Sequence, residues 1–114
     1  MQLIGRYWLS DRSVPFGMFL NFMEIYYSPD VRNDLYDDLV ARARLADSGD
    51  AGMATFKKEL VRLLKGDREG LHSSAIFTAA EYDEWDTDDE FLRWLWRELY
   101  PSELVPMPAA AESD

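Results

Sequence analysis

One segment decides the fold class of this chain: Thr87-Asp88-Asp89-Glu90-Phe91-Leu92-Arg93-Trp94-Leu95-Trp96-Arg97-Glu98-Leu99-Tyr100. Thr87 and Glu90 form a capping box, and the two aspartates between them favour a helix start because the N-terminal end of a helix attracts negative charge. The residues that follow are apolar except for a narrow strip around Glu90, Arg93 and Arg97, so we expect a heavily buried helix that Pro101 ends. The predicted core residues of this helix are Trp94, Leu95 and Leu99.

Upstream of this segment, apolar positions between turn signals predict further helices. The expected helical segments are 16–27, 31–43, 53–64 and 71–80. Ser13 is the expected N-cap of the first, which is apolar nearly all round, and Asp30 is the expected N-cap of the second. Lys65 suits the last turn of the third helix, and Gly66 can end it in the left-handed conformation. The fourth helix is the weakest of the set.

These segments predict an all-α fold, a compact bundle of four to five helices around an aromatic-rich core. No internal repeat and no long alternating run suitable for a sheet occurs in the chain. Residues 1–105 are expected to form a single helical domain, within which residues 1–12 suit either a short strand or a helical turn. Residues 106–114 are Pro, Ala, Ser, Met and acids, which predicts a flexible, disordered acidic tail.

Composition excludes several classes of protein. The chain has 114 residues and no cysteine, which rules out a disulfide scaffold, a thiolate metal site and a cysteine nucleophile. No apolar run approaches the length of a membrane span, and the first residues do not resemble a signal peptide, so we expect a cytoplasmic protein.

The charge balance indicates the kind of partner. The formal net charge is -10 at pH 7, and residues 81–90 carry seven carboxylates and no basic group. Such a surface repels nucleic acid and anionic membranes and attracts basic proteins. We therefore expect neither direct nucleic-acid binding nor membrane binding. A nucleic-acid mimic would need charges spaced across the surface like phosphates, and clustering in ten residues disfavours it.

Enzyme signatures are weak. His72 is the only histidine, and no glycine-rich phosphate-binding motif is present. A calcium loop starting at Asp86 would need a glycine where Phe91 stands and a glutamate where Arg97 stands. We therefore expect no catalytic residue, no metal and no cofactor.

One enzymatic alternative is a metal-dependent all-α nucleotide pyrophosphatase-like hydrolase, which would hold magnesium with acids on neighbouring helices. The candidate ligands are Asp34, Asp37, Asp38, Glu81, Glu84 and Asp88. An ordinary solvated helix face is the stronger interpretation, because Asp38 and Arg42 have the spacing of a stabilising ion pair.

The acidic stretch has more carboxylates than a helix start requires. Aromatic anchors among carboxylates are typical of a surface that binds a basic protein, although either aromatic could instead turn inward to the core. The predicted partner-binding residues are Tyr82, Asp83, Glu84, Trp85, Asp86 and Asp88. Asp89 and Glu90 are assigned mainly to the helix start. The second-choice surface consists of Asp30, Asp34, Asp37 and Asp38.

The assembled pattern resembles the helical immunity proteins of bacterial polymorphic toxins, with contact-dependent growth inhibition systems as the nearest example and colicin-type nuclease immunity proteins next. The likeness covers roughly residues 14–100. It rests on the early segment Phe19-Leu20-Asn21-Phe22-Met23-Glu24-Ile25-Tyr26-Tyr27, a Leu-rich middle helix, the aromatic acidic turn, and the last helix with Glu90-Phe91-Leu92-Arg93-Trp94-Leu95.

The resemblance implies a non-enzymatic function in bacterial competition. Members bind the C-terminal domain of a cognate toxin, often a small basic nuclease. An immunity protein of this kind neutralises the toxin stoichiometrically by presenting carboxylates where substrate phosphates would lie, which occludes the active site.

Overall fold

The computed structural model describes residues 7–11, 13–46 and 48–106. All regular secondary structure in these ranges is helical, which confirms the prediction of an all-α fold for the described part of the chain. The elements are α1 (Tyr7–Ser10), α2 (Gly17–Phe22), the π-helix η1 (Met23–Tyr27), α3 (Arg32–Ala43), α4 (Ala51–Leu64), α5 (Ala75–Ala80) and α6 (Asp88–Leu99). Of the first twelve residues, 7–10 form a helical turn, whereas 1–6 and 12 lie outside the described residues. So does nearly all of the predicted tail, residues 107–114.

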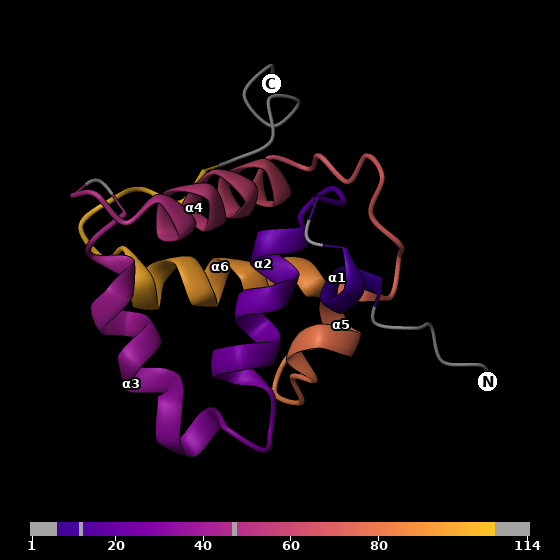
Figure 1. Ribbon diagram of the computed structural model, residues 1–114, viewed down its shortest axis with the longest axis horizontal. Helices are drawn as coiled ribbons and strands as arrows, with labels where there is room; N and C mark the ends of the chain where they lie inside the picture. Colours follow the sequence, from indigo (N-terminus) through magenta and orange to yellow (C-terminus); the bar gives the residue numbers. More distant parts are fainter. Residues whose placement is uncertain (1–6, 12, 47, 107–114) are drawn as a thin grey trace.

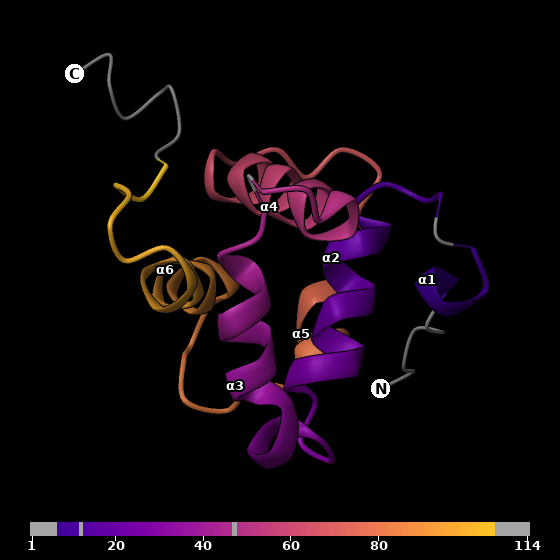
Figure 2. The same cartoon turned by 60° about the vertical axis from the view of Figure 1, so that its left-hand side comes forward.

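The longer helices cross one another around a shared interior. Figures 1 and 2 show α4 packed across the start of α2, with α3 and α6 beside it. The described large side chains that are fully buried include Trp8, Phe16, Phe19, Phe56, Phe91 and Trp96. Phe56 of α4 stacks between two rings of α2, at centroid distances of 5.5 Å to Phe19 and 5.2 Å to Phe22.

The first predicted helix is present, but its start differs from the prediction. Ser13 does not cap it: its amide and its hydroxyl both bond to the Asp11 carboxylate. The helix begins after Phe16, which has the left-handed conformation (φ 61°) and offers no side-chain cap. Glu59 of α4 takes the capping role, since its Oε1 accepts a hydrogen bond from the Phe19 amide at 2.7 Å. A residue 40 positions away therefore satisfies the start of α2.

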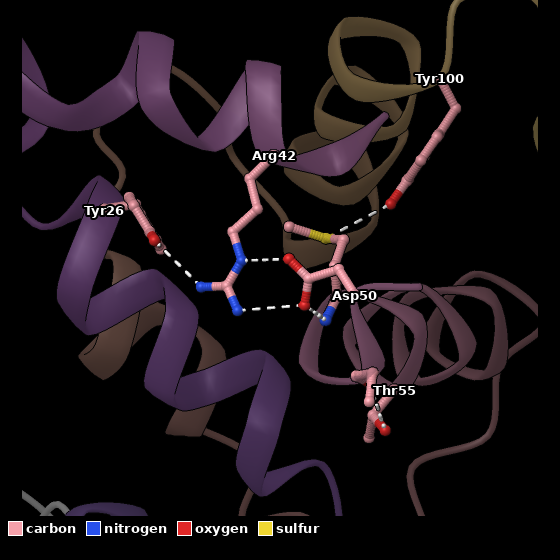
Figure 3. A network of polar contacts seen from close by, with 7 residues as sticks. Tyr26, Arg42, Asp50, Thr55 and Tyr100 are labelled. Carbon is pink, nitrogen blue, oxygen red and sulfur yellow. Dashed lines mark hydrogen bonds and ion pairs between the residues drawn. The ribbon is translucent and has the colours of Figure 1, made fainter. Parts of the chain in front are cut away.

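The connection from α3 to α4 is held by a network that the sequence did not indicate (Figure 3). The prediction that Asp38 pairs with Arg42 is wrong, because Arg42 Nε donates to Asp50 Oδ2 at 2.6 Å and its Nη1 donates to the Tyr26 hydroxyl at 3.1 Å. Asp50 also caps α4 by accepting a hydrogen bond from the Met53 amide at 3.0 Å. The bonds from Arg42 and from Met53 lower the pKa of Asp50 to about 2.

The helix ends follow the sequence where the capping signals are local. Thr87 Oγ1 accepts from the Glu90 amide at 3.2 Å, as predicted, whereas the Glu90 carboxylate accepts from the amide of Asp86. At the end of α4, Gly66 has φ +92° and its amide donates to the Leu63 carbonyl at 3.0 Å, which closes the helix as expected. The prediction that Asp30 caps the second helix is wrong: the N-cap of α3 is Val31, with no side-chain bond.

The predicted core of α6 is confirmed for two of its three residues. Leu95 and Leu99 are buried, but Trp94 is only partly buried. Arg93, Trp94 and Arg97 share the side of α6 that reaches the surface. This difference places one aromatic ring of α6 at the candidate functional site.

Candidate protein-binding site

A surface cavity of about 320 Å³ lies where the acidic segment (residues 81–90), α3 and α6 meet. Four aromatic residues line it, each from a different element or loop: Tyr27 from η1, Tyr36 from α3, Trp85 from the 81–87 segment and Trp94 from α6. Its polar lining residues are Arg32, Asn33, Asp37 and Glu84. We call this cavity the aromatic pocket.

The aromatic pocket joins the two predicted binding surfaces. Glu84 and Trp85 belong to the first-choice set, and Asp37 belongs to the second-choice set. The sequence separates these residues by more than forty positions and gives no sign that they meet. The remaining first-choice and second-choice carboxylates that lie exposed are Asp30, Asp34, Asp38, Asp83 and Asp86.

Tyr82 lies inward, which is the alternative that the sequence left open. Its side chain is buried, with 6% of its surface exposed, and its ring stacks on Phe91 at a centroid distance of 4.8 Å. The Tyr82 hydroxyl donates to the carboxylate of Asp88, which is itself partly buried. Burial, followed by this hydrogen bond, raises the pKa of Tyr82. In the free chain these two residues connect the acidic segment to α6.

The rings of the aromatic pocket lie against one another. Trp85 and Trp94 have a centroid distance of 4.7 Å, and Tyr36 stacks on Trp94 at 6.0 Å with an interplanar angle of 19°. Tyr27 lies 6.0 Å from both Tyr36 and Trp94. Trp85, Trp94 and Tyr36 are partly exposed, whereas Tyr27 is buried. The pocket therefore offers accessible ring surface that the rest of the aromatic cluster supports from behind.

Arg32 links the elements around the aromatic pocket by hydrogen bonds. Its Nε donates to the Tyr27 carbonyl at 2.9 Å, and its Nη2 donates to the carbonyls of Ala80 and Glu81 at 3.1 and 3.2 Å. Its guanidinium also lies 4.2 Å from the centroid of the Tyr27 ring. Glu81 ends α5 in a left-handed conformation, φ 50°, so these bonds stabilise an unusual turn just before the acidic segment. Sequence reasoning missed Arg32, because its partners come from two other elements.

Carboxylates surround the phenols of the pocket. The Tyr36 hydroxyl donates to Glu98 Oε1 at 2.9 Å, and burial, then this bond, raises the pKa of Tyr36. Burial also raises the pKa of Tyr27; Arg32 opposes the shift, and the negative charges of Glu84 and Asp83 add to it. Both hydroxyls therefore remain protonated at neutral pH, in a region of negative potential.

The geometry gives the metal-dependent hydrolase no support. Across residues 7–11, 13–46 and 48–106, no three side chains among His, Asp and Glu come together in a group that could hold a metal ion. Of the candidate ligands, Asp37 and Glu84 line one pocket, but no third acid or histidine of the described residues completes a group with them. His72 is exposed, and its Nδ1 accepts a hydrogen bond from the Ser74 amide at 3.1 Å, which gives it a local structural role.

None of the helices in the described ranges combines the length and the apolar character that a membrane crossing requires. Comparison of the chain with protein-family models, with curated proteins and with solved structures finds no match.

Proposed function

We propose that this chain is an immunity protein, which binds the basic C-terminal domain of a cognate toxin, a nuclease in the simplest case, and neutralises it by stoichiometric occlusion of its active site. The observation that carries the proposal is the aromatic pocket, where accessible rings and carboxylates from both predicted binding surfaces meet. Aromatic anchors surrounded by a polar rim are typical of the energetic centre of a protein interface.

The charges around the pocket support a basic partner. The side chains of Asp83, Glu84 and Asp86 are exposed, and no ion pair with them occurs among the described residues. Within the segment, Asp89 pairs with Arg68 at 2.5 Å. Like charges that lie close together repel one another, which destabilises the free chain, and a cationic surface relieves that repulsion. The arrangement is therefore best explained by charges that act in binding.

A protection assay tests the proposed function. The C-terminal domain encoded by the reading frame next upstream is produced in a bacterial host, with or without this chain. We expect the domain to arrest growth alone, and co-production of the chain to restore growth and give a complex that purifies with fixed stoichiometry. Growth arrest that the chain does not relieve would refute the proposal, as would an upstream domain without toxicity.

A matched pair of charge reversals then tests where the toxin domain binds. Glu84→Lys should lower the association rate by roughly tenfold at low salt, because it removes a steering charge at the pocket. Glu69→Lys changes the net charge equally at an exposed position outside the pocket, and it should have a much smaller effect. Equal rates for the two variants would place the interface elsewhere.

A further inference from the structure

We propose that the aromatic pocket receives one lysine or arginine side chain of the basic partner, held over the faces of Trp85 and Trp94 between the carboxylates of Asp37 and Glu84. The inference deepens the proposed function and rests on it for the identity of the partner. It assigns the pocket as a cation-binding site, which charge steering alone does not require.

The aromatic rings of the pocket are suited to bind a cation. A cation over the face of an aromatic ring is attracted by the negative charge of the ring face, and tryptophan is the strongest of the three aromatic residues in this role. Trp85 and Trp94 lie 4.7 Å apart at an angle of 37°, and Tyr36 extends the surface at 6.0 Å from Trp94. All three rings are partly exposed and line one cavity.

Arg32 shows that this aromatic cluster already holds one guanidinium group. Its charged group lies 4.2 Å from the Tyr27 centroid and is bonded to backbone carbonyls. Arg32 thus lies over Tyr27, whereas Trp85, Trp94 and Tyr36 keep partly exposed surface in the same cavity. Two lining carboxylates, Asp37 and Glu84, outnumber this one basic group.

The carboxylates decide against the other occupants. An apolar side chain in the pocket would bring no charge to Asp37 and Glu84 while it displaced their water, which is unfavourable. An anion would be repelled by them. A cationic side chain with an aliphatic stem satisfies both features, because the stem contacts ring surface and the charged end reaches a carboxylate.

The test uses the indole N–H signals of the four tryptophans in an NMR spectrum of the free chain. The probes are Nα-acetyl-arginine methylamide and Nα-acetyl-lysine methylamide, with Nα-acetyl-norleucine methylamide as the uncharged control. We expect saturable shifts of Trp85 and Trp94 with at least one cationic probe. The buried Trp8 and Trp96 serve as internal references that should not move. Equal shifts with norleucine, or no saturable shift with either cation, would overturn the inference.

Two variants separate the contributions of ring and charge. Trp85→Leu should weaken binding of the cationic probe by about two- to fivefold, which corresponds to one cation–π contact at an exposed site. Glu84→Gln is exposed and should leave the fold intact while it weakens binding of the cation, whereas Glu69→Gln should leave it unchanged. Probe affinity that is unchanged in both Trp85→Leu and Glu84→Gln would refute the site.

The protection assay keeps the two proposals distinguishable. If growth is restored but no cation binds the pocket, the function stands and the cation site is wrong. If the cation binds but growth is not restored, the site stands and the partner has been misidentified.

Discussion

Replacing Glu59 by alanine should destabilise the chain through a helix start 40 residues away in sequence. The Glu59 carboxylate accepts a hydrogen bond from the Phe19 amide at 2.7 Å, and Phe16 offers α2 no side-chain cap. The Phe19 residue is fully buried, so its amide has no water to replace the lost acceptor. A hydrogen bond to a charged group contributes about 1.5–3 kcal/mol, and leaving its buried donor unpaired incurs a similar loss.

We therefore expect Glu59→Ala to lower the free energy of unfolding by about 2 kcal/mol. For a domain of this size, that corresponds to a fall in Tm of roughly 10 °C. Glu59→Gln keeps an oxygen acceptor at the same reach and should therefore lose much less stability than Glu59→Ala. The exposed Glu69→Ala is the control for removal of a carboxylate, and it should melt close to the parent.

The pH dependence gives the same prediction a second readout. Burial raises the pKa of Glu59 above its usual 4.5, and the amides of Phe19 and Met18 oppose the shift only in part. The folded state therefore binds the proton more tightly than the unfolded state does. The stability of the parent relative to Glu59→Gln should be greatest below pH 4.5 and should fall as pH rises through the folded-state pKa.

Urea unfolding followed by circular dichroism, at several pH values between 4 and 7, measures both effects. The reasoning is refuted if Glu59→Ala unfolds at the same urea concentration as Glu69→Ala. A stability difference that changes with pH in the opposite direction would show that the bonds to the carboxylate outweigh its burial.

Three further perturbations test other contacts of the fold. Gly70→Ala should lower the free energy of unfolding by more than the roughly 1–2 kcal/mol that a left-handed backbone costs a residue with a side chain, because φ is +81° and a Cβ would also lie 2.6 Å from Pro15 Cγ. A melting temperature equal to that of the parent would contradict this prediction. Asp50→Asn should make the free energy of unfolding depend less on pH in acid. In the parent, ionised Asp50 stabilises the folded state above pH 3.8, and this stabilisation is lost as pH falls towards the folded-state pKa of about 2. A constant difference between parent and variant in urea unfolding down to pH 2 would contradict the prediction. Phe91→Ala should lower the free energy of unfolding by about 3–5 kcal/mol, whereas Phe77→Ala should lower it much less, because the Phe77 side chain is 52% exposed. Equal losses measured by calorimetry would show that the stack of Phe91 on Tyr82 is not important for stability.

The sequence was sufficient wherever a signal and its partner lie within one turn of each other. Thr87 predicts the start of α6, and Lys65 with Gly66 predicts the end of α4, because each signal acts on the backbone beside it. The burial of Leu95 and Leu99 follows from helical periodicity in the same way. Local rules therefore predict most of the helices, but they did not indicate that residues 23–27 of the first one form a π-helix.

Features that depend on distant partners could not be predicted. Arg42 has an acid at the favourable helical spacing, yet it bonds to Asp50 because the turn after α3 brings that carboxylate to 2.6 Å. The same holds for the aromatic pocket. The charge and aromatic pattern of the acidic segment indicated Glu84 and Trp85. That Asp37 lies in the same pocket depends on how the helices pack, which the sequence does not show. The apolar composition of this helix placed Trp94 in the core, but composition does not show which residues of the helix meet a gap between its neighbours.

The π-helix η1 links the length of the chain to the shape of its surface. The Ser28 amide donates to the Met23 carbonyl at 2.9 Å, a spacing of five residues, so this turn holds one residue more than an α-helix does. Deleting the exposed Ile25 would remove the extra residue and let the turn close as an α-helix. Because Tyr27 ends this turn, the deletion would change the packing of a ring that now lies 6.0 Å from Trp94. Insertion or loss of a single residue in this helix is therefore a route by which related chains could acquire different pocket walls, and so different partners, without substitution of any residue that lines the pocket.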